Sequence, residues 1–450
     1  MIILVRYVSF SYALSDTLVS HICMLVFFIL RLMRVSLRYG RRVLDLELPQ
    51  TAKVYIAEPK EAVSADLDVM LSRALKRNLG DVGFESLARS GEKVMILVDD
   101  YTRETPTKDI LPPLLEMLRR NGIRSEDVTV MMALGTHRKP TAAELQEKLG
   151  PVVDEYRVTF HDAESCEYTE LGSYKGIPIL VNREVVEHDL VLGVGMIVPH
   201  RVSGFSGGSK IIQPGVSAPE TTGYTHWISA GIPGREILGT VDNEVRRVMD
   251  VAAERAGLRA VLNVVLDSGK KVAEVFFGGF REVLREGASE ARRIFGVKLP
   301  WEADVVIAEC PPPKDINLWQ AAKAIYSATL AVKKGGSIII AARCPEGAAP
   351  EHPEVERYGY MPYPRVKELV EEGEVEDLIA AAHMAHVGEA VERASAVYLV
   401  SEMGRRKVEK LGLVYAGSLD EAVEAAVKTH GKSCRILVMK DAPDLLPLHS

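Results

Sequence analysis

The groups best suited to perform chemistry are concentrated between residues 198 and 227, in the stretch VPHRVSGFSGGSKIIQPGVSAPETTGYTHW. Lys210 stands in a loop of glycine and serine, and His200 and His226 flank that loop. An amine can act as a nucleophile or a point charge, and an imidazole can accept a proton or ligate a metal. Small residues also let backbone N–H groups close round an anion, which predicts a phosphate-sized cradle. The residues of this cradle include Ser206, Gly207 and Gly208.

Three functional interpretations compete for this loop. A nucleotide-binding P-loop is excluded, because it needs a serine or threonine directly after the lysine, whereas Ile211 follows Lys210. The segment GFSGG fits the G-x-S-x-G pattern of serine hydrolases, with Ser206 as the nucleophile and a flanking histidine as the base. That class places the serine in a direct strand-to-helix turn, which the sequence HRVS interrupts here. A flexible glycine turn with solvent-facing histidines is the third interpretation.

The arrangement PHRVSGFSGGSK, followed by QPG and a later Thr-His pair, resembles the nickel-dependent lactate racemase family. In that family a lysine lies ten residues after one histidine, and a second histidine lies sixteen residues further on. His200, Lys210 and His226 keep this spacing. The resemblance implies that Lys210 is tethered covalently to a nickel pincer nucleotide of the pyridinium-3,5-dithiocarboxylic acid mononucleotide type. It also implies that His226 ligates the nickel and that His200 is a catalytic base.

Two further segments are similar to parts of the same family. The segment DDYTRETP resembles the family pattern D-x-T-R-P-x-P, which implies that Asp100 holds the cofactor and Arg103 holds the substrate carboxylate. Glu104 stands where the family usually has proline. The segment GTHR resembles the family pattern G-x-H-R, which implies that His137 is the second catalytic base. Racemisation needs two bases, because each enantiomer loses its hydroxyl proton on a different face.

A later segment, DINLWQAAKA, resembles the family stretch L-x-Q-N-x-Y-Q-A-x-K, whose glutamine and lysine meet the substrate carboxylate. The corresponding residues are Gln320 and Lys323, which project from one face of a predicted helix because they are three apart. Arg103 and Lys323 would then place two cations on one carboxylate. His383 and His386 lie in the region where the family frequently has a tryptophan, which predicts a substrate that is larger or more polar than lactate.

Short apolar runs predict buried strands in the first half of the chain, at residues 94–98, 128–134 and 190–197. Polar groups follow each run directly, and ligands bind beyond the carboxyl ends of the strands in open α/β sheets. The second half contains a similar alternation of strand, helix and strand, at residues 302–309, 316–332 and 337–342. These patterns predict an α/β fold with mostly parallel sheets.

A length of 450 residues exceeds what one hydrophobic core usually holds, so we predict two domains with the active site in the cleft between them. The first is a cofactor-binding α/β domain over residues 33–297, completed by residues 425–450, where RILVM predicts another strand. The second is an α/β domain over residues 298–424. Residues 1–32 are expected to be an upstream or disordered extension, with Met33 as the natural start. An interfacial membrane anchor is the alternative for this extension.

Composition excludes several classes of protein. A net charge of −7 without basic tracts argues against nucleic-acid binding. The apolar run at residues 22–33 is short and contains Arg31, so no stable membrane insertion is expected. The cysteines form no C-x-x-C pair, which fits a reducing cytoplasm and excludes a cysteine-based zinc site. They are Cys23, Cys166, Cys310, Cys344 and Cys434.

The residues and the resemblance together predict a racemase or epimerase of a 2-hydroxy carboxylic acid. The resemblance implies hydride transfer to the nickel pincer nucleotide on Lys210, which avoids a carbanion at a carbon whose hydrogen is poorly acidic. The expected partners are a small 2-hydroxy acid and the enzymes that make the cofactor. The alternatives are a serine hydrolase that uses Ser206 and a non-catalytic binder of a pyridine nucleotide.

Overall fold

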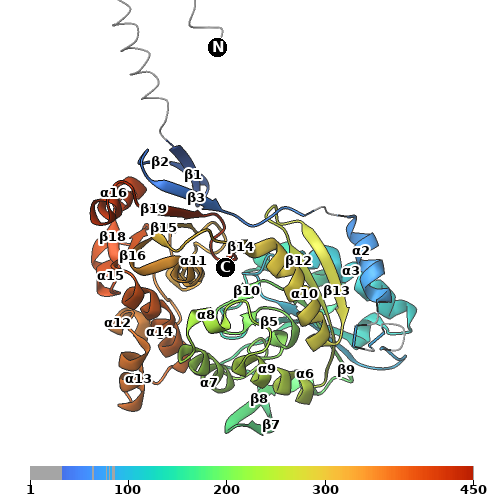
Figure 1. Cartoon of the computed structure of the whole chain (residues 1–450). Coiled ribbons are helices and arrows are strands. Elements are labelled where there is room, and N and C mark those ends of the chain that lie inside the picture. The colour runs from blue at the N-terminus through green and yellow to red at the C-terminus, as the bar shows by residue number, and fades with distance from the viewer. Residues whose placement is uncertain (1–32, 63–64, 78, 81, 84–86, 449–450) are drawn as a thin grey trace, which may run out of the picture.

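The computed structural model describes residues 33–448 apart from 63–64, 78, 81 and 84–86. The predictions for residues 1–32 lie outside the described residues. Two six-stranded sheets with surrounding helices form the frame of the molecule, and they lie side by side in Figure 1. The predicted α/β class with mostly parallel sheets is confirmed.

The first sheet has the strand order β13-β12-β9-β4-β5-β6. All neighbours are parallel except β12 and β13. The strands β4, β5 and β9 are buried almost throughout, as expected of short apolar runs covered on both faces. The strand bounds are β4 (Val94–Asp99), β5 (Val128–Ala133), β6 (Arg157–Phe160), β9 (Leu190–Met196), β12 (Leu258–Leu266) and β13 (Val272–Gly278).

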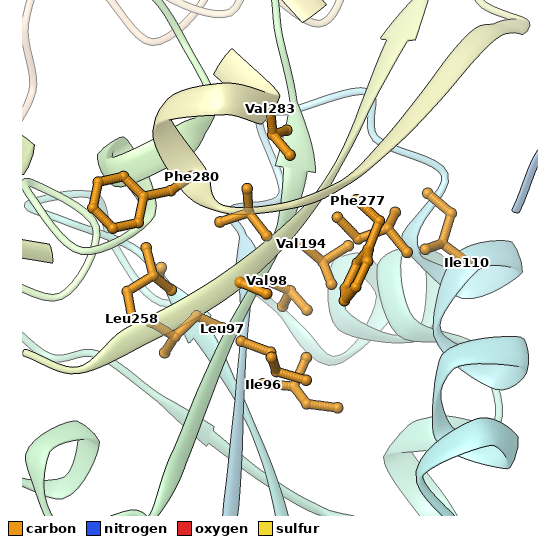
Figure 2. Close-up of a cluster of buried hydrophobic side chains, with 14 of the residues drawn as sticks. Ile96, Leu97, Val98, Ile110, Val194, Leu258, Phe277, Phe280 and Val283 are labelled. Carbon is orange, nitrogen blue, oxygen red and sulfur yellow. The ribbon is translucent and has the colours of Figure 1, made fainter. Parts of the chain in front are cut away.

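One hydrophobic cluster joins this sheet to its helices, and Figure 2 shows part of it. Ile96 and Val98 of β4 and Val194 of β9 lie in this cluster with Ile110 of α3 and Val283 of α10. Because all five side chains are essentially removed from water, this packing fixes β4 and β9 as the rigid centre of the sheet. The helices of this half include α2 (Leu67–Lys76), α3 (Thr107–Arg120), α9 (Glu244–Arg255) and α10 (Phe280–Phe295).

The order of β9, β4 and β5 positions the candidate site. These three strands are neighbours and run parallel, so their carboxyl ends meet at one edge of the sheet. Asp100 directly follows β4, His137 follows β5 after a short turn, and His200 follows β9. Residues a hundred positions apart in the chain are thereby brought to the same edge.

The second sheet has the order β18-β17-β16-β15-β19-β3, with every neighbouring pair parallel. Side chains of β15 alternate between two cores: Val306 packs with α11 and α14, and Val305 packs with α16 and the hairpin β1–β2. The bounds are β3 (Lys53–Ala57), β15 (Ala303–Glu309), β16 (Val332–Ala341), β17 (Ala396–Val400), β18 (Val414–Ala416) and β19 (Arg435–Met439). The surrounding elements are β1 (Met33–Tyr39), β2 (Arg42–Leu48), α11 (Leu318–Ala331), α14 (Leu378–Arg393) and α16 (Leu419–His430).

The strand pairing corrects the predicted division into domains at 33–297, 298–424 and 425–450. The strand β19 does not complete the first sheet, because it lies between β15 and β3 in the second. The segment 33–57 also belongs there, and Figure 1 shows the blue β1–β3 beside the red β19 and α16. An apolar run specifies a strand but not its partner, which is why the sequence pattern placed both segments wrongly.

The remaining elements are short or connect the two halves. The helix α4 begins after Thr141, whose side chain forms a capping box with Glu144. No helix of the described part of the chain combines the length and apolarity that a membrane crossing requires. The other helices are α5 (Val152–Glu155), α6 (Arg183–Val186), α7 (Pro219–Ala230), α8 (Gly234–Ile237), α12 (Pro353–Tyr358), α13 (Tyr363–Glu371) and α15 (Arg405–Lys410), with α4 at Ala142–Leu149. The short strands and 3-10 turns are β7 (Tyr168–Tyr174), β8 (Ile177–Asn182), β10 (Pro199–His200), β11 (Gly204–Phe205), β14 (Gly296–Lys298), β20 (Leu446–Leu448), η2 (Ser125–Asp127) and η3 (Gly208–Ile211).

Candidate active site

A cavity of about 160 Å³ lies beyond the carboxyl ends of β4, β5 and β9. Its other walls come from α7 in the first half of the chain and from α11 and α14 beside the second sheet. Of the predicted site residues, only Gly208 is not part of its lining. The predicted residues that do line it are Asp100, Arg103, His137, His200, Ser206, Gly207, Lys210, His226, Gln320 and Lys323.

The glycine-rich loop owes its shape to packing and not to anion binding. The amide N–H of Ser206 donates to Val198 O at 2.8 Å, and that of Gly208 donates to Asn263 Oδ1 at 2.8 Å. Gly207 and Gly208 have φ values of +77° and +58°, and a Cβ on Gly207 would lie 2.6 Å from Ile197 Cγ1. The prediction that these amides form an anion cradle is therefore wrong for Ser206 and Gly208.

Arg246, which was not among the predicted site residues, holds this loop in place. Its guanidinium donates to the carbonyl oxygens of Ser203, Phe205 and Gly207 and to the hydroxyl of Ser209. The residue is only 2% exposed, so these contacts replace the water that a charge would otherwise need. The available signal was a charge on the apolar face of a helix, because Arg246 lies among the buried residues of α9.

The Ser206 hydroxyl is engaged with the backbone at the end of β9. It donates to Met196 O at 2.7 Å and accepts from the N–H of Val198 at 3.0 Å. Within the described ranges no histidine nitrogen forms a hydrogen bond with this hydroxyl. Ser206 therefore lacks the base that would activate it as a hydrolase nucleophile.

Lys210 lines the cavity, and the pKa of its amine is unusually low. It lies in η3, and burial of its amine, followed by the charge of Arg103, lowers its pKa to about 7. Near pH 7 a large fraction of this amine is therefore neutral. A neutral amine is nucleophilic, so Lys210 is suited to forming a covalent bond.

His226 presents one free ring nitrogen to the cavity. On α7, its Nδ1–H donates to Thr222 O at 2.9 Å, one helical turn earlier. This contact fixes the tautomer and leaves the lone pair of Nε2 available. Burial lowers the pKa of His226 to about 4, so the imidazole is neutral at pH 7, as a metal ligand must be.

Two further histidines of the cavity, His200 and His137, are suited to proton transfer. Burial, followed by the charge of Lys210, holds the pKa of His200 well below its usual value. The Ser203 hydroxyl lies 3.2 Å from His200 Nδ1 and donates its own hydrogen to Phe205 O, so it can accept from Nδ1–H, whereas the Val202 N–H can only donate to Nδ1, at 3.3 Å. The two contacts favour opposite tautomers, and the neutral ring can accept a proton at whichever nitrogen lacks one. His137 Nδ1 lies 3.4 Å from Asp100 Oδ2, close enough for the carboxylate to stabilise an imidazolium.

Arg103 and Lys323 bring two basic side chains to the same lining. Lys323 Nζ donates to Gln320 Oε1 at 2.5 Å, and burial and the charge of Arg103 hold the pKa of Lys323 well below its usual value. Burial alone would raise the pKa of the Asp100 carboxyl, but the charges of His137 and Arg103 hold that pKa well below its usual value. A bound carboxylate would offset the mutual repulsion of Arg103 and Lys323.

Comparison with protein families supports the resemblance noted in the sequence. Residues 39–236 match the lactate racemase N-terminal domain, and residues 300–445 match the lactate racemase C-terminal domain. The chain belongs to the lactate racemase family. This is a family of isomerases, and membership implies a nickel-pincer cofactor.

Individual relatives agree with this assignment. A lactate racemase of Thermoanaerobacterium thermosaccharolyticum is 32% identical over 321 residues, which cover 70% of this chain and 75% of that protein. A lactate racemase of Lactiplantibacillus plantarum is 26% identical over 82% of this chain and 88% of that protein. The apoprotein structure of the T. thermosaccharolyticum lactate racemase superposes with a TM-score of 0.83 at 27% identity, over 92% of this chain and all of that one. A Thermotoga maritima protein at 23% identity shares the fold, with a TM-score of 0.67 over 81% of this chain and 95% of that one.

An ion-pair cluster surrounds Glu104, which directly follows Arg103 in the chain. The Glu104 carboxylate lies 3.1 Å from Lys270 Nζ and 3.3 Å from Lys314 Nζ. Lys314 also contacts Asp444, at 2.5 Å. Lys270 belongs to the β12–β13 turn of the first sheet, whereas Lys314 and Asp444 follow strands of the second. The cluster therefore fastens the segment that carries Arg103 to both halves of the molecule.

His383 does not provide the polar contact that the sequence led us to expect. Its Nδ1 lies 2.9 Å from the hydroxyl of Tyr326 and its Nε2 lies 3.4 Å from that of Tyr360. Burial lowers its pKa to about 3, and the ring stacks on Trp319 at 4.0 Å. His386 Nε2 is likewise engaged, with the Ser229 hydroxyl at 3.0 Å. His383 therefore contributes a neutral aromatic surface to the cavity, and both of its ring nitrogens lie within hydrogen-bonding distance of tyrosine hydroxyls.

Proposed function

We propose that this protein is a racemase or epimerase of a 2-hydroxy carboxylic acid. The observation that carries the proposal is one cavity that brings together a lysine with a pKa of about 7, the cations Arg103 and Lys323, and five histidines. Three of the histidines, His137, His200 and His226, are the predicted site residues. The names of its relatives support the same reaction class. The hydroxy-acid substrate is implied by the family.

The residues present fit a nickel pincer nucleotide attached to Lys210. The lysine amine has a pKa of about 7, and the Nε2 lone pair of His226 is free. Across the described part of the chain, no three His, Cys, Asp or Glu side chains gather into a site that could hold a metal ion by themselves. A nickel ion beside His226 would therefore take its other ligands from the nucleotide. When bound, this group supplies the hydride acceptor, and Asp100, Ser206 and Gly207 would line its pocket.

The chain's own groups would bind the substrate and move its hydroxyl proton. Arg103, Lys323 and Gln320 hold the carboxylate and so orient the second carbon. His200, neutral at pH 7, accepts the hydroxyl proton of one enantiomer, and His137 accepts that of the other. The Asp100 carboxylate stabilises the His137 imidazolium that forms. The same histidines return the proton to the product.

The test is interconversion of enantiopure 2-hydroxy acids by protein made in cells that also make the cofactor. Chiral chromatography should show the opposite enantiomer. In D2O the hydrogen on carbon 2 should be retained, because it leaves and returns as hydride without exchanging with water. A fluorophosphonate adduct on Ser206 with ester hydrolysis, or nucleotide binding without isomerisation, would contradict the proposal.

The proposed function also implies partner enzymes, and the cysteines bear on the location of the protein. The enzymes that assemble the cofactor must act in the same cell, so they are the expected partners. A cytoplasmic location is supported by free thiols. These are Cys166, Cys310, Cys344 and Cys434.

Glu104→Gln should raise the KM for the carboxylate substrate about tenfold. The reason is that hydrogen bonds to a charged group of this kind stabilise the observed position of the segment that carries Arg103 by ~1.5–3 kcal/mol. The value of kcat and the mass of any Lys210 adduct should change little, since the cluster orients Arg103 and does not touch the reacting atoms. Steady-state kinetics with the exposed control Glu147→Gln measures this effect. An unchanged KM in Glu104→Gln would show that the cluster does not position Arg103.

A further inference from the structure

A second cavity, of about 310 Å³, lies beside the first. The two cavities share His137, Trp319 and Gln320 in their linings. The second is lined by residues after β4 and β5 and by residues 316–352 from the other half of the molecule. It is therefore placed to receive a part of the substrate that extends beyond the carboxylate clamp.

Trp319 forms the wall between the two cavities. Its indole is stacked between His383, at 4.0 Å and 26°, and His352, at 4.2 Å and 17°. His383 lines the first cavity and His352 lines the second, so the two imidazoles lie on opposite faces of the indole. Gln320 and His137 border both spaces, so the second cavity adjoins the residues proposed to bind the carboxylate.

The second cavity contains a histidine whose orientation is fixed and whose outer nitrogen is unused. Asp377 Oδ1 accepts the N–H groups of Ile379 and Ala380 at the start of α14, at 2.8 and 3.1 Å. Its Oδ2 accepts from His352 Nδ1–H at 2.6 Å. In the neutral imidazole the proton therefore sits on Nδ1, and Nε2 carries the lone pair. Among the described residues no partner forms a hydrogen bond with this Nε2.

The polar lining selects for hydrogen-bond donors. His352 Nε2 is an acceptor, and the carboxylates of Glu346 and Glu351 belong to the same lining. Arg138 belongs to the same lining, but Glu144 already pairs with its guanidinium. A second carboxylate on the substrate would therefore be repelled by the two acids, and an apolar chain would leave the acceptors unpaired. Substrate hydroxyls can donate to all of them.

We propose that the second cavity is a subsite for the far end of a 2-hydroxy acid longer than lactate, and that it selects chains with further hydroxyl groups. One of these hydroxyls donates a hydrogen bond to Nε2 of His352, which Asp377 orients. The substrate class is thus the polyhydroxy monocarboxylic acids, and the inference rests on the racemase or epimerase function proposed above.

The experiment compares gluconate, lactate and malate as substrates of the cofactor-loaded protein. Wild-type protein should have its highest kcat/KM with gluconate and its lowest with malate. His352→Phe keeps an aromatic ring to stack on Trp319 and removes both nitrogens. It should lower the ratio of kcat/KM for gluconate to that for lactate about 5- to 10-fold, the effect of one lost hydrogen bond.

Asp377→Asn provides the matched second variant. An asparagine oxygen still caps α14, so the helix should be kept, as circular dichroism would verify. Its amide can donate to Nδ1, which would turn Nε2 of His352 into a donor. The same ratio should then fall by less than in His352→Phe, because a substrate hydroxyl can still accept from Nε2–H. A ratio that is unchanged in both variants, or a wild-type preference for lactate or malate, would overturn the subsite and leave the racemase function standing.

Calorimetry separates failure of the subsite from failure of the proposed function. Gluconate should bind wild-type protein about 5- to 10-fold more tightly than it binds His352→Phe, whether or not isomerisation occurs. Loaded protein that isomerises none of the three acids, yet shows this difference in affinity, would overturn the function and retain the subsite for polyhydroxy acids. Equal affinities would overturn the subsite.

Discussion

Lys210→Ala should abolish isomerisation and leave the fold intact. The amine projects into the cavity, and its proposed contribution is a covalent bond and not packing. Burial gives it a pKa of about 7, which keeps part of it neutral and nucleophilic under ordinary conditions. Without this bond the cofactor has no anchor, so the hydride acceptor is lost.

The measurement combines intact mass, chiral chromatography and thermal unfolding of protein from cofactor-making cells. Wild type should carry an added mass on Lys210, and the alanine variant should carry none and still unfold cooperatively. Lys210→Arg is the matched control, because it keeps a positive charge but lacks a nucleophilic amine. Both variants should be inactive, which separates the bond from the charge. Full activity in either would rule out the tether.

The part of the site that the sequence predicted depends on local patterns. The apolar runs before Asp100, His137 and His200 predicted buried strands, and the rule that ligands bind at carboxyl ends brought these residues to one edge. The family spacing then added Lys210 and His226, which the structure places in the same cavity. The positions of these residues could be predicted because each depends on a short segment, together with the family spacing or a general property of parallel sheets, whereas their roles stay predictions.

The part that the sequence did not predict depends on contacts between distant segments. The pairing of β19 with β3 joins residues almost four hundred positions apart, and neither strand carries a signal for its partner. Arg246 reaches the loop backbone from a helix forty residues later, and a lone charge on a helix gives no hint of such a target. The glycines of the loop suggested anion binding. However, the N–H of Gly208 already donates to Asn263, and the side chain of Ile197 packs against Gly207.

His226→Ala should lose nickel, whereas His200→Ala should keep it and lose activity. Both imidazoles are buried in the same cavity and both are neutral at pH 7, so burial and charge do not distinguish them. The hydrogen bonds of the two imidazoles do distinguish them. The Thr222 carbonyl fixes the proton of His226 on Nδ1 and leaves Nε2 to a metal. His200 Nδ1 instead faces the Val202 N–H and the Ser203 hydroxyl, which favour opposite tautomers and so do not reserve Nε2 for a metal.

The measurement is nickel per chain, by elemental analysis after gel filtration, together with the mass of the Lys210 adduct. We expect His226→Ala to retain roughly a tenth or less of the wild-type nickel, because the nucleotide alone must then hold the ion, and to keep its adduct. His200→Ala should retain nickel and adduct but lose about 10²- to 10⁴-fold in turnover, the usual contribution of a general base. Equal nickel loss in the two variants would contradict the assignment, because it would mean that the tautomer fixed by Thr222 does not decide which histidine binds the metal.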